Sequence, residues 1–248
     1  MRRIIPLLVV MLPLAAHAME TVYQDQVDPP AEGGSGQAEA ALDGRSGNSS
    51  DHEFTAGGRV DYRAHTTTMS ITGDYTRLNA NGIKAVDTGW ADAHYIDEFQ
   101  HGLAAEAYMD YLQDDMRQLA NRTQVGAGAR FTLDYEHQER ALYLSVDGLH
   151  EWQSQANVSN DYWRANTAIN YMRQISPQAH ILASLQYQPR LSQWSNYLIN
   201  DVLELGVDIT SSLSLQLGLR HEYDNIVPTG MGIKHNDTVY ETALRLRY

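Results

Sequence analysis

The feature that most constrains this chain is an apolar alternation with a period of two residues. In the last segment one face carries, in chain order, Tyr240, Thr242, Leu244, Leu246 and Tyr248. Residues 213–219 place leucine at every second position, with a polar residue or glycine between. Successive side chains of a strand point to opposite faces, so this pattern predicts β-strands with one apolar and one polar face. No segment shows sustained helical periodicity.

About twelve alternating segments follow one another along the chain. They centre on residues 37–46, 53–62, 68–77, 88–96, 102–112, 123–135, 140–151, 162–173, 179–189, 198–210, 213–223 and 238–248. The connections after even-numbered strands are predicted to be short. Those after odd-numbered strands are predicted to be long and polar, at residues 78–87, 113–122, 152–161, 190–197 and 224–237. An even strand number with tight turns at one end and loops at the other is typical of outer-membrane barrels.

The charges on the polar faces decide between a soluble sandwich and a membrane barrel. The predicted inward, lumen-lining residues are Glu39, Asp43, Arg45, Arg59, Asp61, Asp74, Asp92, Glu106, Asp110, Arg130, Asp134, Arg164, Glu204, Asp208, Arg220, Glu222, Glu241, Arg245 and Arg247. A sandwich core would not hold so many charges, because burying an unpaired charge is costly. In a bilayer every backbone group must be paired, so strands close into a barrel. We therefore expect an all-β, closed antiparallel up-and-down transmembrane β-barrel, with short periplasmic turns and longer external loops.

The aromatic composition fits the same fold. The chain has 15 Tyr and 4 Trp against 3 Phe, which favours rings that lie between an apolar and a wet environment. Two belts at the membrane interfaces are predicted from Tyr62, Tyr75, Trp90, Tyr95, Tyr111, Tyr135, Trp152, Trp163, Tyr171, Trp194, Tyr223 and Tyr248. The alternative is a soluble β protein with ordinary half-buried tyrosines.

The N-terminus is predicted to be a targeting segment. Arg2 and Arg3 precede an apolar run that ends at Ala16, and Ala16-His17-Ala18 matches a signal-peptide cleavage pattern. Residues 1–18 are therefore interpreted as a signal peptide cleaved after Ala18, residues 19–36 as a flexible periplasmic linker, and residues 37–248 as the barrel. Without Arg2 and Arg3 the net charge is 16 − 31 = −15, which argues against a nucleic-acid partner.

The sequence offers little for catalysis. Hydrolase candidates at the loop end are Asp87, His150, Glu151, Asp224, His235 and Asp237. A histidine-activated nucleophile requires contact between the two groups, which the spacing does not indicate. We expect no enzyme, cofactor or metal site, although Asp114-Asp115 and residues 235–237 are weak cation candidates. Gly126-Ala127-Gly128 lacks the features of a phosphate loop and is interpreted as glycines in a crowded strand.

Several segments resemble the salt-induced outer-membrane protein family, whose biochemical function is unknown. They are Ser46-Gly47-Asn48, residues 125–128, residues 185–189, Leu213-Ser214-Leu215, residues 220–225, Pro228 and Asp237-Thr238. The resemblance covers roughly residues 36 to 248 and implies a Gram-negative outer-membrane barrel linked to envelope or osmotic stress, with no catalytic residues to carry over. Tyr240, Leu244, Leu246 and Tyr248 also resemble the assembly signal of such barrels, although Tyr stands where Phe is more usual.

The predicted fold leaves three functional hypotheses. A twelve-stranded barrel lies between small barrels filled by side chains and large ones with a water channel. The protein is then a narrow, weakly cation-preferring pore, a closed structural or stress-adaptation protein, or an outer-membrane hydrolase acting on lipid or peptide. Expected partners are outer-membrane lipid, lipopolysaccharide and, through the last strand, the barrel-assembly machinery.

Overall fold

The computed structural model of the chain describes residues 32–45, 51–136, 139–210, 213–230 and 232–246. The predicted signal peptide and most of the predicted linker lie outside the described residues, as do Arg247 and Tyr248. The backbone is described at the following predicted positions, but their side chains are not: Glu39, Asp43, Arg45, Glu241, Leu244, Arg245 and Leu246.

Twelve strands make one antiparallel sheet in which spatial order equals chain order. They are β1 (Gly33–Arg45), β2 (Asp51–Ala64), β3 (Thr67–Ala80), β4 (Ile83–Gln100), β5 (Leu103–Asp114), β6 (Leu119–Glu136), β7 (Arg140–Gln155), β8 (Val158–Ser176), β9 (Ala179–Arg190), β10 (Gln193–Asp208), β11 (Leu213–Asp224) and β12 (Asn236–Leu246). The predicted all-β, up-and-down arrangement is confirmed. The first strand begins at Gly33, inside the segment predicted to be linker.

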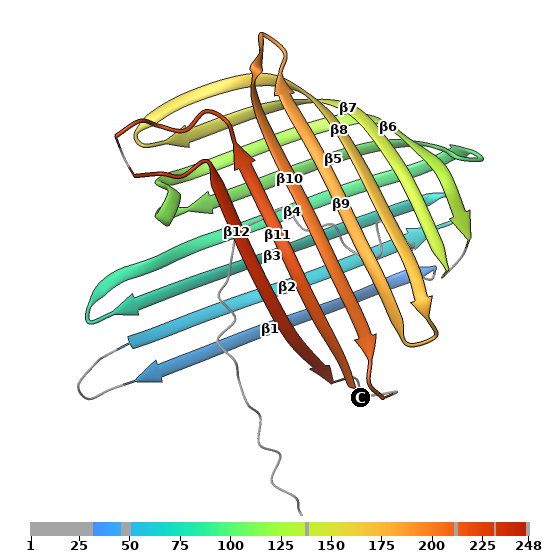
Figure 1. Cartoon of the computed structure of the whole chain (residues 1–248), viewed down its shortest axis with the longest axis horizontal. Coiled ribbons are helices and arrows are strands. Elements are labelled where there is room, and N and C mark those ends of the chain that lie inside the picture. Colours follow the sequence, from blue (N-terminus) through green and yellow to red (C-terminus); the bar gives the residue numbers. More distant parts are fainter. Residues whose placement is uncertain (1–31, 46–50, 137–138, 211–212, 231, 247–248) are drawn as a thin grey trace, which may run out of the picture.

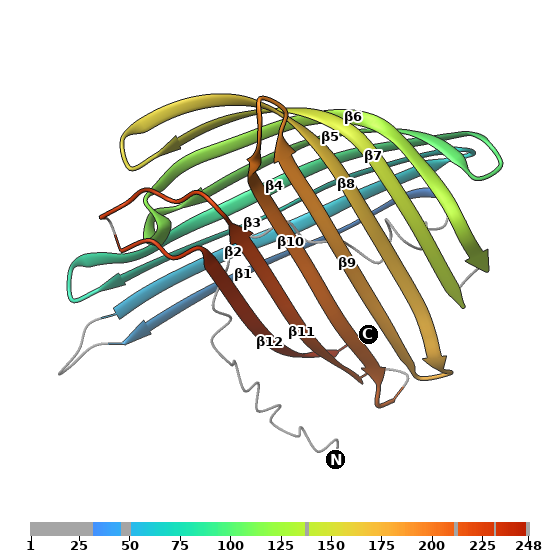
Figure 2. The ribbon, with the colours of Figure 1, turned by 45° about the horizontal axis from the view of Figure 1, so that its top comes forward.

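The sheet curves strongly, so that its first and last strands lie on opposite sides of a hollow (Figures 1 and 2). Its inner, concave face is called the interior below. Among the described residues β1 pairs with β2 alone and β12 with β11 alone. Closure of the sheet into a barrel therefore remains a prediction. In the described part of the chain, no helix is long and apolar enough to cross a membrane.

The strands are longer than predicted, and most of the predicted long loops are wrong. The connections at residues 81–82, 156–157 and 191–192 are two-residue turns, and η1 (Asp115–Arg117), a 3₁₀ turn, joins β5 to β6. Only residues 225–235 form a long connection among those described. Ladder hydrogen bonds do not depend on side-chain polarity, so strands continue where both faces are polar. Figure 1 shows these hairpins extending at one end of the sheet, here called the loop-side rim, opposite the turn-side rim.

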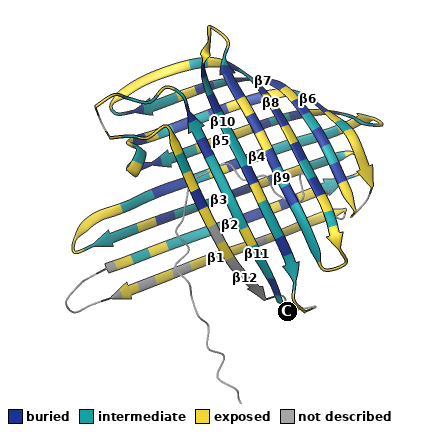
Figure 3. Ribbon diagram, viewed as in Figure 1, coloured by how far each residue is buried: buried dark blue, intermediate teal, exposed yellow. Residues whose placement is uncertain are grey.

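Burial alternates along each strand, but in the reverse sense to a water-soluble protein. In β7 the side chains of Tyr143, Ser145, Asp147, Leu149 and Glu151 are buried in the interior, and the residues between them face outward. Figure 3 shows this alternation as bands across the sheet. Polar and charged residues outnumber apolar ones among the buried side chains. The exposed large apolar residues on the convex face include Val60, Ile71, Met109, Leu133, Val146, Leu185 and Leu203.

Two glycines of β6 make room for interior side chains. A Cβ on Gly126 would lie 2.3 Å from Cζ of Tyr108, and one on Gly128 would lie 2.3 Å from Cβ of Asp147. Tyr108 thereby crosses β6 and donates a hydrogen bond to Asp147 on β7, at 2.6 Å. The interpretation of Gly126-Ala127-Gly128 as glycines in a crowded strand is confirmed.

Candidate functional site

A charged network crosses the interior near the loop-side rim. The loop-side network, as we name it, consists of Arg117, Arg122, Glu151, Arg164, Glu222 and Asp224. Its arginines come from η1, β6 and β8, and its acids from β7 and β11. Since β6 and β11 are separated by four strands in the sheet, their contacts bridge the hollow.

Glu222 is the centre of one branch. It accepts two hydrogen bonds from Arg117, at 2.8 and 2.5 Å, and one from Arg122 at 3.1 Å. Arg122 also contacts Asp224 at 3.5 Å. The paired geometry of Arg117 and Glu222 is bidentate, the arrangement in which arginine–carboxylate pairs are strongest.

Glu151, fully buried on β7, is the centre of the other branch. It accepts hydrogen bonds from Arg164 at 2.9 Å and from Gln124 at 2.7 Å. Gln124 also reaches Gln188 on β9, at 3.1 Å. All the carboxylate oxygens of Glu151, Glu222 and Asp224 therefore have donors, since Asp224 also accepts from the backbone of Ile226 at 3.0 Å.

The turn η1 holds Arg117 over the interior. The side chain of Asp114 accepts hydrogen bonds from the backbone N–H groups of Met116 and Arg117, at 2.9 and 3.3 Å, which fixes the start of the turn. Asp115 forms an ion pair with Lys84. Burial of Arg117 opposes its charge, but the neighbouring carboxylates, Glu222 first, outweigh this and raise its pKa above the usual arginine value. Arg117 therefore stays charged and fixed in place.

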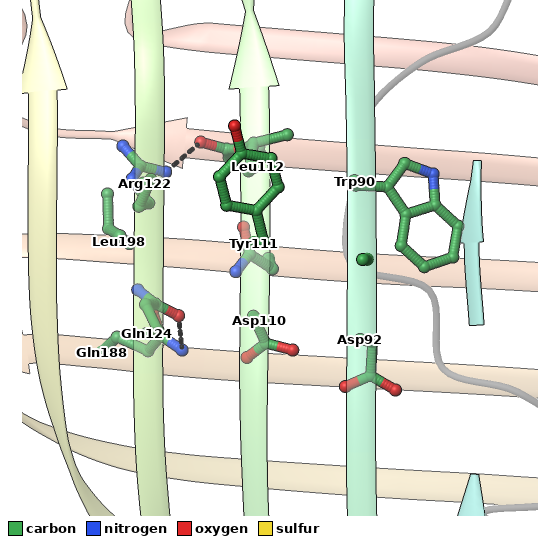
Figure 4. A pocket seen from close by; sticks show the side chains of 12 residues that line it. Trp90, Asp92, Asp110, Tyr111, Leu112, Arg122, Gln124, Gln188 and Leu198 are labelled. Atoms are coloured by element: carbon green, nitrogen blue, oxygen red, sulfur yellow. Dashed lines mark hydrogen bonds and ion pairs between the residues drawn. The ribbon is translucent and has the colours of Figure 1, made fainter. Parts of the chain in front are cut away.

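A small cavity of about 40 Å³ lies next to this network (Figure 4). It is lined from six strands, by residues that include Trp90, Asp92, Asp110, Gln124 and Asn200. Asp92 on β4 and Asp110 on β5 are directly opposite each other in the strand register. Polar and apolar side chains both line this cavity, and its volume is enough for one or a few water-sized species.

Towards the turn-side rim the interior is filled by further polar contacts. Glu106 accepts hydrogen bonds from Ser145 and contacts His94 Nε2, both at 2.7 Å. The guanidinium of Arg130 lies 3.8 Å from the ring centroid of Tyr143. A second cavity of about 130 Å³ opens there. The interior thus consists of packed polar layers with small spaces between them.

Most described residues of the predicted lumen set lie on the concave face. They are Arg59, Asp61, Asp74, Asp92, Glu106, Asp110, Arg130, Arg164, Glu204, Asp208, Arg220 and Glu222. Asp134 is a correction. The register shifts between Thr132 and Asp134, which places Asp134 opposite Leu142 on the convex side, where it pairs with Arg140 at 2.8 Å. A bulge reverses the faces beyond it.

The predicted interface aromatics divide in a similar way. The convex face carries Tyr62, Tyr75, Tyr95, Tyr111, Trp152, Trp163, Tyr171 and Tyr223. Trp194 lies at the start of β10 and is 63% exposed. Two predictions are wrong: Trp90 shares the interior face with Asp92, and Tyr135 is turned inward by the β6 bulge and lines the turn-side cavity.

Two convex tyrosines, Tyr187 and Tyr197, and much of the interior site were not predicted from the sequence. Ring contacts link Tyr187 to Tyr197 and Tyr197 to Tyr223, at centroid distances of 5.5 and 5.9 Å. Arg122 and Gln124 are separated from Arg130 by even numbers of residues in β6, so all three point to the same face. The predicted strand begins at residue 123, and a start one residue earlier would have included Arg122. Arg117 lies in the three-residue turn η1, whose capping residue Asp114 was interpreted in the sequence only as a weak cation candidate.

The predicted hydrolase residues do not assemble. His150 packs between Trp152 and Trp163 on the convex face, at centroid distances of 4.3 and 4.7 Å, whereas Glu151 lies inside. The ring of His235 contacts the backbone oxygen of Asp224 at 2.7 Å, and not a nucleophile. Asp87 pairs with Lys84 at 3.0 Å. The described residues also contain no group of three or more histidine or acidic side chains suited to hold a metal ion.

Comparison with known proteins gives the family but no activity. Residues 38–248 match the family model described as "Protein of unknown function, DUF481", and the chain belongs to this family. No curated protein sequence matches the chain. Two solved structures are similar: a NanC porin, at 8% identity and a TM-score of 0.47, covering 86% of this chain and 99% of the porin, and an anion-selective porin from Comamonas acidovorans, at 7% identity and a TM-score of 0.36, covering 86% and 96%.

Proposed function

We propose that the protein is a non-catalytic outer-membrane β-barrel that forms a narrow, weakly cation-preferring pore. The observation that carries this proposal is the reversed pattern of burial, with charges inside and large apolar side chains outside. Val60 and Ile71 are 60% and 63% exposed on neighbouring strands. Covering a large apolar side chain contributes about 1.5–3 kcal/mol, so lipid around the convex face is strongly favoured over water.

The membrane also requires the sheet to close. An open edge leaves unpaired backbone groups, which hydrocarbon does not satisfy. We therefore propose that β1 and β12 pair in the bilayer, after cleavage of the signal peptide and delivery by the barrel-assembly machinery. Outer-membrane lipid would contact the convex face, and lipopolysaccharide would contact the hairpins of the loop-side rim.

The loop-side network would be the constriction of the pore. Its charges are nearly balanced and its members bridge the hollow, so it leaves only a narrow path for ions. Away from the network, interior acids such as Asp92, Asp110 and Glu204 add negative charge to the path. Rings of acidic side chains favour cations in pores, which supports a weak cation preference.

A closed structural protein of the envelope, associated with salt stress, is the second candidate. It is favoured by the complete burial of Leu149, Glu151 and Gln188, because solvent does not reach these interior side chains. The two candidates differ in one measurable property, the passage of ions.

Planar bilayer recordings of the refolded protein test the proposal. The expected result is small single-channel steps with a reversal potential shifted towards cations. The double variant Arg117→Ala/Glu222→Ala removes opposite charges together and should enlarge the steps. A matched control, Arg59→Ala/Asp61→Ala, removes a buried pair at 2.7 Å that lies outside the network and should leave them unchanged. Absence of steps from wild type and from the network variant, in all salts, would favour the closed protein.

A further inference from the structure

Arg190, the last residue of β9, carries a positive charge at the loop-side rim that no acid of the described chain neutralises. The guanidinium carbon lies 4.2 Å from the ring centroid of Tyr162 on β8. The side chain forms no hydrogen bond or ion pair with any described residue, and its Nε is buried without a partner. A buried donor without an acceptor costs free energy, which points to a missing partner.

A second arginine lies directly opposite the first. Arg164 on β8 is the register partner of Arg190, so both side chains point into the interior. Like charges directly opposite each other on neighbouring strands are destabilising. Arg164 contacts Glu151 at 2.9 Å and Asn196 at 3.3 Å, but its Nε is also buried without a partner. This pair of arginines therefore shares one carboxylate.

The acids of the loop-side network cannot supply the missing charge. The network contains three arginines and three acids, so its own charges cancel. Glu222 is held by Arg117 and Arg122, and the two oxygens of Glu151 accept from Arg164 and Gln124. Turning any of these acids towards Arg190 would remove a hydrogen bond elsewhere. The counter-charge must therefore come from outside the chain.

The contact with Tyr162 fixes Arg190 and leaves its donors available. A guanidinium over an aromatic ring is attracted through its flat face, whereas its N–H groups point outward in its own plane. Arg190 is also only half-buried, so its group is not sealed from solvent. The planar fork of donors matches the two oxygens of a carboxylate.

We propose that Arg190, with Arg164 beside it, binds the carboxylate of a small soluble compound at the loop-side end of the interior. One uncancelled positive charge matches a singly charged carboxylate. Both arginines lie on the concave face, so a dissolved compound reaches them and a lipid on the convex face does not. The site goes beyond the proposed pore, because it requires access from the loop-side rim and no passage through the sheet.

Chemical modification of arginine tests the site without measuring conduction. Phenylglyoxal reacts with accessible guanidinium groups, and mass spectrometry of peptides gives the rate at each arginine of the folded, refolded mature protein in detergent. Arg190 should react in chloride, and acetate at about ten times its dissociation constant should slow that reaction about ten-fold at equal ionic strength. Arg173, an exposed arginine near the other end of β8, is the internal control and should react equally in both salts.

Urea titration of variants gives an independent measurement. Acetate should raise the unfolding midpoint of wild type and of Arg173→Gln relative to chloride, and Arg190→Gln should lose this shift. Tyr162→Phe keeps the aromatic face and should retain it. Heat-modifiable gel mobility identifies the variants that fold, and the wild-type protection experiment stands without them.

Three results would overturn the site. They are no reaction of Arg190 in chloride, equal rates of its reaction in acetate and chloride, and an acetate shift that persists in folded Arg190→Gln. Protection by inorganic phosphate but not by acetate would overturn the assignment to a carboxylate. Single-channel steps without protection would contradict the site alone, and protection without steps would contradict the pore alone.

Discussion

The loop-side network and Asp92 lie next to each other in the interior, on the same small cavity, but the hydrogen bonding of their carboxylates differs. In the network, Glu151 and Glu222 each accept donors at both oxygens. At the cavity, Oδ1 of Asp92 has none. A buried carboxylate whose oxygens all accept hydrogen bonds stabilises the structure, whereas a buried carboxylate oxygen that accepts none costs free energy. The same concave face thus combines carboxylates that are fully hydrogen bonded with one that is not.

The largest loss of stability is expected from a substitution at Glu222, in the loop-side network. Glu222→Gln leaves Arg117 without its bidentate partner and weakens the hold on Arg122. Breaking a buried pair costs about 3–5 kcal/mol, so the free energy of unfolding in lipid vesicles, measured by urea titration, should fall by about this amount. A loss below 1 kcal/mol would show that the network does not hold the interior together.

A smaller loss of stability is expected when the packing around Asp147, another interior acid that accepts hydrogen bonds, is disturbed. Gly126→Ala places a methyl group against Tyr108, which donates to Asp147. Overpacking costs about 1–3 kcal/mol, and unfolding should become easier by that amount. Gly148→Ala is the matched control, because its Cβ would meet nothing within 4 Å. Equal losses in the two variants would mean that the Tyr108 contact is not responsible.

The smallest effect on stability, and one of opposite sign, is expected at the unsatisfied acid. Asp92→Asn removes a buried charge whose Oδ1 accepts no hydrogen bond, so the stability of the protein by urea titration should be unchanged or slightly higher. The reversal potential of its channels should move towards zero, because the interior loses negative charge. A loss of stability as large as that of Glu222→Gln would erase the difference between the two regions.

Much of the fold was predictable because alternation fixes the strands and their faces. The twelve strands and their order follow from period two and from short turns between neighbours. The hairpin ends were predicted poorly, since polar stretches were interpreted as loops. The dipeptide Asn81-Gly82 is a sequence signal for a two-residue hairpin turn, because Asn and Gly tolerate the positive φ that such a turn requires. In the structure the two residues have φ angles of 51° and 77°.

The interior site was only partly predictable. Trp90 is two residues from Asp92 in the same strand, so alternation alone places both side chains in the interior. Trp90 therefore did not need to be assigned to a membrane-interface belt. The bulge after Thr132 has no equivalent signal, and it reversed the faces of Asp134 and Tyr135. Pairing across the hollow, as between Arg122 and Glu222, depends on how the sheet curves. The alternation of a strand therefore predicts which face of the sheet a side chain occupies, but not which residue on a distant strand it pairs with.

In the proposed barrel the convex face contacts lipid and the concave face does not. Ile71 and Thr72 are adjacent in β3 but are 63% and 5% exposed, on opposite faces. The chain contains no cysteine, so Ile71→Cys and Thr72→Cys each introduce a single labelling site. With a fluorophore at that site and spin-labelled lipids in the vesicles, we expect strong quenching at position 71 and little at position 72. Equal quenching at the two positions, or none at position 71, would contradict it.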